Sequence, residues 1–228
     1  MSSTTMSSVE QSDDELVPPT AAENTGREVA KRVFAREFND ATHTFSESDE
    51  ERAPNYVLLP TGAKANRVFV VGTITETQDV GSDSEYWQAR VVDPTGTFFA
   101  YAGQYQPEAA NVLRSLEPPA YVAIVAKART YETEDGGRNV SVQPEAITEV
   151  DGDVRDHWVV ETAERSIDRL EAFDADEDLY AGRAADEYDE VDRDAYASMV
   201  QAALSSIESI EIEFDDELDN GGEGEDEE

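Results

Sequence analysis

The sequence has 228 residues, of which 53 are Asp or Glu and 17 are Lys or Arg, so the formal net charge is −36. It contains no cysteine, which excludes disulfides, thiol catalysis and Cys-ligated zinc or iron–sulfur sites. Its two histidines are too few for an imidazole-rich metal site, and we expect no cofactor. No apolar run approaches the ~18 residues of a membrane span, so we expect a soluble, cytoplasmic protein that contacts no membrane.

The acidity is concentrated in the last third of the chain, whereas the centre is nearly balanced. Only three of the basic residues are lysines. An acidic surface with few lysines is typical of proteins from salt-accumulating halophiles. Repulsion at this net charge opposes a compact state in dilute buffer, but at ~1 M salt the Debye length falls to ~3 Å and most of the repulsion disappears. We therefore interpret the acidity first as an adaptation to salt.

The N-terminal part divides into two predicted segments. Residues 1–25 are rich in Ser, Thr and Glu without an apolar period, which predicts a disordered arm. Residues 26–53 are predicted to form a basic helix followed by a polar linker. The helix is placed at Arg27–Phe38, where apolar residues recur on one helical face beside a cluster of basic residues.

Between residues 54 and 152 the pattern changes to short β-rich runs separated by turns. Asp93–Gly96 (DPTG) has the chemistry of a type I turn. Pro107–Leu116 predicts a short helix with proline in its first turn, and Glu134–Gly137 predicts a hairpin. Counted from Val68, the order is three strands, a helix and two strands, which is the order of a five-stranded OB-fold barrel. An SH3-like barrel or a small sandwich is the alternative.

Three segments follow the barrel. Residues 153–174 predict an amphipathic helix, residues 175–212 an acidic helical segment and residues 213–228 a disordered acidic tail. Within the acidic segment, Tyr196–Ile207 repeats apolar residues at spacings of three and four, with Asp192 or Asp194 placed to cap the helix. The predicted class is therefore mainly β with flanking helices: an OB-fold barrel, an amphipathic C-terminal helix and an acidic helical extension.

Alternation along the second and third predicted strands of the barrel sorts their side chains into two faces. In the second strand the apolar set points to the core, which leaves Tyr86, Gln88 and Arg90 facing outward. In the third strand the same reasoning leaves Phe99 and Tyr101 outward, although the opposite assignment fits that strand nearly as well. Exposed aromatics beside an arginine suit single-stranded nucleic acid, because stacking contributes ~1–3 kcal/mol per base.

Three basic residues extend the predicted nucleic-acid-binding surface. Lys127, Arg129 and Arg138 flank the fourth predicted strand and its hairpin, where they can meet phosphates. Affinity that comes from phosphate contacts falls steeply as salt rises. We therefore expect stacking to dominate over charge in molar salt.

Five segments of the sequence resemble the archaeal replication protein A-associated proteins. They are REVAKRVFAREF at 27–38, NYVLLPTG at 55–62, VVDPTGTFFAYAGQYQPEA at 91–109, LEPPAYVAIVAK at 116–127 and VSVQPEAITEVD at 140–151. The resemblance covers about residues 26–173, and the long DPTGTFFAYAGQYQPEA block makes it fairly specific. Haloarchaeal members of the family share the acidity of this chain.

This resemblance implies a single OB-fold subunit or companion of a replication protein A complex. Such a protein would act on single-stranded DNA in replication, repair and recombination, together with a larger OB-fold subunit. In related complexes the helix after each OB-fold joins an intersubunit bundle, and the matching positions here include Trp158, Ile167, Leu170 and Phe173. The resemblance implies no catalytic residue and no small-molecule substrate, and the zinc motif of some large subunits is absent because the chain has no cysteine.

Two other functions are alternatives. The first is an acidic protein–protein adaptor that docks on the large subunit without contacting DNA, using the helical and acidic last third of the chain. The second is a carboxylate–metal nuclease, since acidic pairs such as Asp151 and Asp153 are plentiful. No nucleophile, base or phosphate-binding loop accompanies these acids, so we expect a protein that is not an enzyme.

Overall fold

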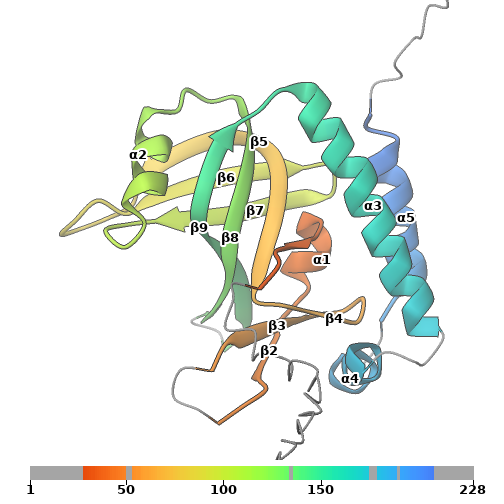
Figure 1. The fold of residues 1–228 in the computed structure, drawn as a ribbon. Coiled ribbons are helices and arrows are strands. Elements are labelled where there is room, and N and C mark those ends of the chain that lie inside the picture. The colour runs from red at the N-terminus through yellow and green to blue at the C-terminus, as the bar shows by residue number, and fades with distance from the viewer. Residues whose placement is uncertain (1–27, 50–52, 134–135, 175–178, 189–190, 208–228) are drawn as a thin grey trace, which may run out of the picture.

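A computed structural model gives the fold of most of the chain (Figure 1). The residues that it describes are 28–49, 53–133, 136–174, 179–188 and 191–207. The arm predicted over residues 1–25 and the tail predicted over residues 213–228 lie outside the described residues.

Five strands form the barrel at the centre of the molecule. They are β5 (Arg67–Asp79), β6 (Trp87–Asp93), β7 (Gly96–Ala102), β8 (Ala120–Glu132) and β9 (Arg138–Glu149). β5, β6 and β7 form an antiparallel meander, β9 pairs in parallel with β7 at Ala100 and Val142, and β8 pairs with both β9 and β5. The pairing of β5 with β8 closes the sheet. This order and closure are those of an OB-fold, which confirms the predicted class.

β9 contains a proline and continues past it through a bulge. Pro144 cannot donate a backbone hydrogen bond, and proline within a sheet is confined mostly to edges, strand starts and bulges. In the structure the pairing with β8 shifts register, and Glu145 is the extra residue between Pro144 and Ala146. The strand then continues to Glu149 with a local bend.

Two helices close the ends of the barrel (Figure 1). α2 (Pro107–Ser115), the short helix that the sequence predicted, buries Leu113 completely at one end. α1 (Ala35–Asn39) lies at the other end, where the ring of Phe38 packs 5.7 Å from that of Phe98. The predicted DPTG turn joins β6 to β7, and the buried Asp93 carboxylate accepts backbone hydrogen bonds from this turn and from the first turn of α1.

The helix predicted over residues 27–38 is mostly replaced by extended chain. Lys31–Arg32 forms a short strand, β1, that pairs in parallel with β5, and the helix α1 begins only at Ala35. Lys31 and Arg32 pair with β5, and Phe34 is buried against Trp158, so tertiary contacts override the local helical pattern.

A second, smaller sheet lies below the barrel in Figure 1. Its strands are β2 (His43–Ser46), β3 (Asn55–Leu59) and β4 (Ala63–Ala65), in the order β2-β3-β4. β2 falls in the segment predicted as a linker, and β3 lies in the region after residue 54 for which the sequence predicted short β-rich runs. β3 therefore does not contribute to the barrel, whose strands begin at β5.

Three helices follow the barrel; the two longer ones lie along one side of it, and the shortest lies beside the small sheet (Figure 1). α3 (Gly152–Asp174) packs on β5 and on α5 (Arg193–Leu204), and α4 (Leu179–Glu187) packs on the small sheet. α5 buries the apolar face predicted from its spacing, and Asp192 caps it by accepting a hydrogen bond from the Ala195 amide. Within the described part of the chain, none of the helices combines the length and apolar character that crossing a membrane requires.

Candidate nucleic-acid interface

The outer faces of β6 and β7 carry the polar and aromatic residues that alternation predicted. The predicted inward set packs into the core: Trp87 is partly buried against it, and the other members are buried, namely Ala89, Val91, Phe98, Ala100 and Ala102. Tyr86, just before β6, and Phe99, on β7, are 44% and 40% exposed. The assignment of faces is therefore confirmed for both strands, including the one for which the opposite choice fitted nearly as well.

Tyr86 and Tyr101 form a stacked pair on this face. Their ring centroids are 5.7 Å apart, with an angle of 18° between the ring planes. Gln88 lies opposite Tyr101 in the β6–β7 register, and its side-chain amide donates a 2.6 Å hydrogen bond to the tyrosine hydroxyl. The pair thus presents a flat aromatic surface whose position is fixed by its neighbours.

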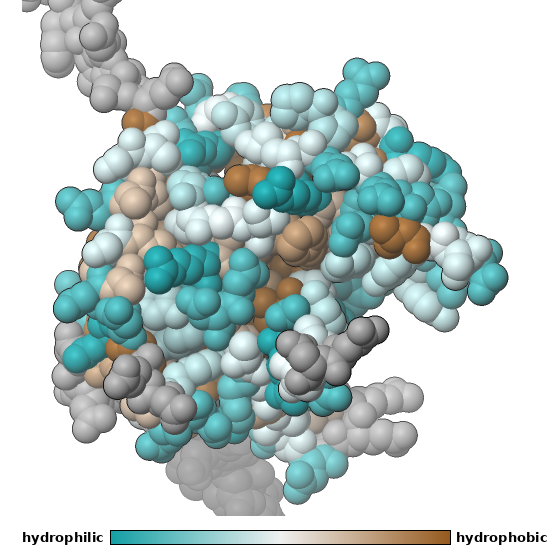
Figure 2. Space-filling model, turned by 180° about the vertical axis from the view of Figure 1, so that it is seen from behind, coloured by the Kyte–Doolittle hydropathy of each residue, from teal (hydrophilic) through white to brown (hydrophobic). Residues whose placement is uncertain are grey.

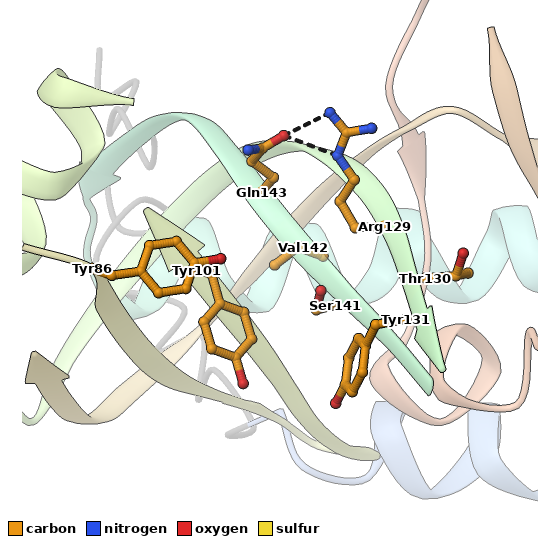
Figure 3. Close-up of a pocket in the computed structure, with 8 residues that line it drawn as sticks. All are labelled: Tyr86, Tyr101, Arg129, Thr130, Tyr131, Ser141, Val142 and Gln143. Atoms are coloured by element: carbon orange, nitrogen blue, oxygen red, sulfur yellow. Dashed lines mark hydrogen bonds between the residues drawn. The ribbon is translucent and has the colours of Figure 1, made fainter. Parts of the chain in front are cut away.

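The hairpin of β8 and β9 supplies the opposite wall of a pocket of about 420 Å³. In Figure 3, Tyr86 and Tyr101 lie together on one side and Tyr131 of β8 lies on the other, with β9 between them. Arg129 donates two hydrogen bonds, of 2.9 and 2.7 Å, to the side-chain oxygen of Gln143 (Figure 3). The pocket therefore combines aromatic rings with a guanidinium group held in place.

The loop between β5 and β6 is braced by Asp79, which fixes the backbone of Tyr86. The Asp79 carboxylate accepts hydrogen bonds of 3.0 Å from the Tyr86 and Gly81 amides. These two bonds, chiefly the one from Tyr86, hold the pKa of Asp79 below its ordinary value. The loop is closed further by a 2.9 Å bond from the Val80 amide to the Tyr86 carbonyl.

Arg90 and Phe99 extend the face beyond the pocket. They lie directly opposite each other in the β6–β7 register, and both are exposed. Among the residues that the structure describes, Arg90 forms no ion pair. The Arg90 guanidinium is thus available to a phosphate, and the Phe99 ring beside it is available to a base.

The structure places the remaining two predicted basic residues apart from this pocket. Lys127 lines a neighbouring pocket beside α2. Arg138 points toward β2, with contacts of 3.5 Å to the Thr42 carbonyl and 3.4 Å to the Thr44 hydroxyl. Arg138 therefore links the hairpin to the small sheet.

The residues predicted for a subunit interface are mostly covered by the protein itself. Trp158 is 2% exposed, packs edge-on against Phe34 at 5.6 Å and donates a hydrogen bond to the Phe69 carbonyl. Leu170 packs against the main core and Phe173 against the small cluster beneath α4. Trp158 is therefore a core residue, and the prediction that it faces a partner was wrong.

Ile167 differs from the other three predicted interface residues because it is 42% exposed. Val160, two turns earlier on α3, is 49% exposed. The outer surface of α3 therefore carries two exposed apolar side chains. Elsewhere the surface is mixed, with hydrophilic residues over most of the view in Figure 2 and apolar ones scattered among them.

Sequence reasoning missed Tyr131 and Gln143. Lys127, Arg129 and Tyr131 alternate along β8 and are all exposed, so extending the alternation of the two basic residues by one step would have found Tyr131. Gln143 gives no comparable signal, because its position depends on how β9 pairs with β8 beside the bulge.

The pocket is lined by groups that can contact bases and phosphates. Its rings can stack on bases, and Arg129 and the tyrosine hydroxyls can donate hydrogen bonds to phosphates or base edges. In the described ranges of the chain, His, Asp and Glu form no group of three that could hold a metal ion. The fold and the site together define an OB-fold protein whose barrel carries a partly exposed face rich in aromatic residues.

No family model matches the chain, and no curated protein matches it. Similar solved structures include the mitochondrial single-stranded DNA binding protein Rim1 of S. cerevisiae, 21% identical over 37% of this chain and 92% of that chain, with a TM-score of 0.31. Another is the second single-stranded DNA binding protein of Mycobacterium smegmatis, 23% identical over 37% of this chain and 86% of that chain, with a TM-score of 0.33. A third is an OBody bound to hen egg-white lysozyme, 19% identical over 37% of this chain and 93% of that chain, with a TM-score of 0.32. The assignment of the OB-fold rests on the strand order and pairing of the barrel itself.

Proposed function

We propose that this protein binds single-stranded DNA through the outer face of β6 and β7 and the hairpin of β8 and β9. The observation that carries the proposal is the stacked pair of Tyr86 and Tyr101, which faces Tyr131 and Arg129 across a pocket. OB-fold barrels bind oligonucleotides on this face and with these loops. The protein acts as a binding module and catalyses no reaction.

Stacking is the interaction that suits this chain best. With a net charge of −36 the protein repels a polyanion at long range in dilute buffer. In molar salt the Debye length is ~3 Å, so this repulsion is screened while the few phosphate contacts also weaken. Stacking of bases on aromatic rings is the interaction that persists in molar salt, and the site provides three tyrosines for it.

We further propose that the protein works as a subunit or companion of a replication protein A complex in DNA replication, repair and recombination. Support comes from the sequence resemblance over about residues 26–173. The exposed side chains of Val160 and Ile167 on α3 provide an apolar surface for a larger OB-fold subunit. An adaptor that docks on this subunit without contacting DNA is the competing function.

Titration of a fluorescently labelled single strand with the full chain in about 2 M KCl tests the proposal, with duplex DNA as the control. Binding to the single strand alone supports it. Failure to bind the single strand, together with assembly with a larger OB-fold subunit, would favour the adaptor instead.

A further inference from the structure

A second pocket, of about 360 Å³, lies next to the first and shares Gln143 with it. Its walls are the turn before α2, the middle of β8 and the bulge of β9. The residues that matter for its chemistry are Tyr105, Glu108, Lys127, Gln143 and Glu145. Asp79 and Gln88, whose hydrogen bonds hold Tyr86 and Tyr101, do not line this pocket.

The bulge in β9 shapes this second pocket. Pro144 and Glu145 lie where two residues of β9 pass one residue of β8, and this arrangement bends the strand. The Glu145 carboxylate forms an ion pair with Arg67, and both side chains are largely buried. Its negative charge is thus compensated within the protein, so Glu145 does not exclude a phosphate from the pocket.

Tyr105 is the most conspicuous residue of the second pocket, because it is 83% exposed. The turn that carries it is held by a 2.9 Å hydrogen bond from the Gln106 amide to the Gly103 carbonyl, and Pro107 begins α2 directly afterwards. The backbone that carries the Tyr105 ring is therefore fixed, whereas the ring itself is exposed to solvent. Such a ring binds a base without first losing buried contacts.

Lys127 supplies positive charge on the other wall of the pocket. It is exposed, and within the described ranges it forms neither an ion pair nor a side-chain hydrogen bond. Gln143 lies opposite it in the β8–β9 register, and the Gln143 side chain reaches Arg129 in the first pocket. The two pockets are thus connected through a single side chain.

We propose that the single strand bound in the first pocket continues past Gln143 into the second, where a base stacks on Tyr105 and Lys127 contacts the adjacent phosphate. This inference rests on the proposed function and adds a second subsite to it. A single OB-fold binds about 4–16 nucleotides. A strand that occupies both pockets contacts more nucleotides than the lower end of this range.

Glu108 provides a second test of this subsite, because its charge lies on the wall of the second pocket. Its exposed carboxylate lies in the first turn of α2, on the wall of the second pocket, and opposes a phosphate there. Glu108→Gln removes this repulsion. We therefore expect the substitution to tighten binding of strands long enough to enter the second pocket and to leave the shortest strands unaffected.

Length-dependent binding tests the second subsite. Labelled oligothymidylates of about 4 to about 16 nucleotides are titrated by fluorescence anisotropy with the full chain and with Tyr105→Ala, Glu108→Gln and the control Tyr121→Ala. Tyr121 is 41% exposed on β8 and lines neither pocket, so it controls for loss of an exposed ring. Thermal unfolding of each variant verifies that it folds.

The expected result is a loss of about 5-fold or more in the affinity of Tyr105→Ala for the longest strands, with the shortest strand unchanged. Glu108→Gln is expected to move the affinity for long strands in the opposite direction. The subsite is overturned if the unsubstituted chain binds single strands but Tyr105→Ala loses nothing, or loses the same factor at every length. If the unsubstituted chain binds no strand of any length, the proposed function itself fails.

Discussion

The rings of Tyr86 and Tyr101 stack on each other with 18° between their planes, and the Tyr101 hydroxyl accepts a hydrogen bond from Gln88. One tyrosine precedes β6 and the other belongs to β7, so the pair also ties the β5–β6 loop to the sheet. A base that stacks on this pair meets a surface already held in place, and it therefore does not have to order the rings on binding.

Removing one ring of this pair is expected to weaken DNA binding. We predict that Tyr101→Ala loses about 5- to 150-fold in affinity for a single strand, which corresponds to the ~1–3 kcal/mol of one stacked base. Tyr101→Phe keeps the ring and loses only the bond with Gln88, so its loss should be smaller. Anisotropy titrations measure both, and equal losses in the two variants would contradict a stacking role.

Arg129 is expected to contribute through a phosphate. We predict that Arg129→Gln lowers the slope of log K against log salt concentration by about 0.7, the value for one phosphate contact on a single strand. Its effect on affinity should therefore shrink as KCl rises, whereas the effect of Tyr101→Ala should persist. Titrations at several KCl concentrations check this, and an unchanged slope would show that Arg129 does not contact a phosphate.

Asp79 is expected to support binding without touching the DNA. Asp79→Ala removes the acceptor for the Tyr86 and Gly81 amides, so the loop and the Tyr86 ring lose their fixed position. We predict a loss of affinity for single strands with little change in the free energy of unfolding, because Asp79 is on the surface. Circular dichroism melting and anisotropy separate the two effects.

The pKa of Asp79 gives the sign of its pH dependence. Because its folded-state pKa is lowered, the support from the carboxylate is present above the ordinary pKa of an aspartate and is lost as pH falls through the lowered value. The contribution of Asp79 to affinity should therefore be constant between about pH 5 and pH 8. A difference between Asp79→Ala and the unsubstituted chain that varies within this range would contradict the assignment.

The ion pair of Glu37 and Arg169 is expected to stabilise the fold. Glu37 of α1 is completely buried, and Arg169 of α3 donates to both of its carboxylate oxygens, at 3.0 and 2.8 Å. Arg169→Ala leaves this carboxylate buried without its partner, and we predict a loss of about 3–5 kcal/mol in the free energy of unfolding.

The matched control for that prediction is Arg165→Ala, whose side chain is 61% exposed and pairs with Asp168 one turn away. Surface pairs contribute about 0–1 kcal/mol, so this variant should unfold almost as the unsubstituted chain does. Urea denaturation at one fixed KCl concentration measures both. A loss below about 1 kcal/mol for Arg169→Ala would mean that the pair is not needed to join α1 to α3.

Ile167 is expected to affect assembly and not DNA binding. Ile167→Asp places a charge on the exposed surface of α3, on the side away from the core. If α3 contacts a larger OB-fold replication protein A subunit, this variant should fail to co-elute with it in size-exclusion chromatography while binding single strands normally. Unchanged co-elution would remove α3 from the proposed interface.

Local patterns in the sequence were sufficient for the barrel and for three of the residues that line the pocket, Tyr86, Tyr101 and Arg129. The DPTG turn and the alternation around Tyr86 and Phe99 depend on neighbours along the chain, and the structure agrees with both. The segment 27–38 has a helical pattern, but pairing with β5 and burial of Phe34 decide its conformation. These contacts come from residues far away in sequence, which a local pattern does not contain.

The positions of Trp158 and Gln143 also depend on contacts that a local sequence pattern does not contain. An apolar stripe on α3 is expected whether the helix packs on its own barrel or on a partner, so spacing alone could not show that Trp158 is in the core. Gln143 reaches the pocket because of the register beside the bulge of β9, and one sequence does not reveal that register.

Photo-cross-linking tests most directly whether the pocket is where DNA binds. A single strand of about 16 nucleotides substituted with 5-iodouracil is irradiated with the full chain in high KCl, and the attached residues are mapped by mass spectrometry. We expect cross-links to Tyr86, Tyr101 or Tyr131, and their loss when unlabelled single strand competes. Cross-links confined to residues outside the faces of β6–β7 and β8–β9 would contradict it.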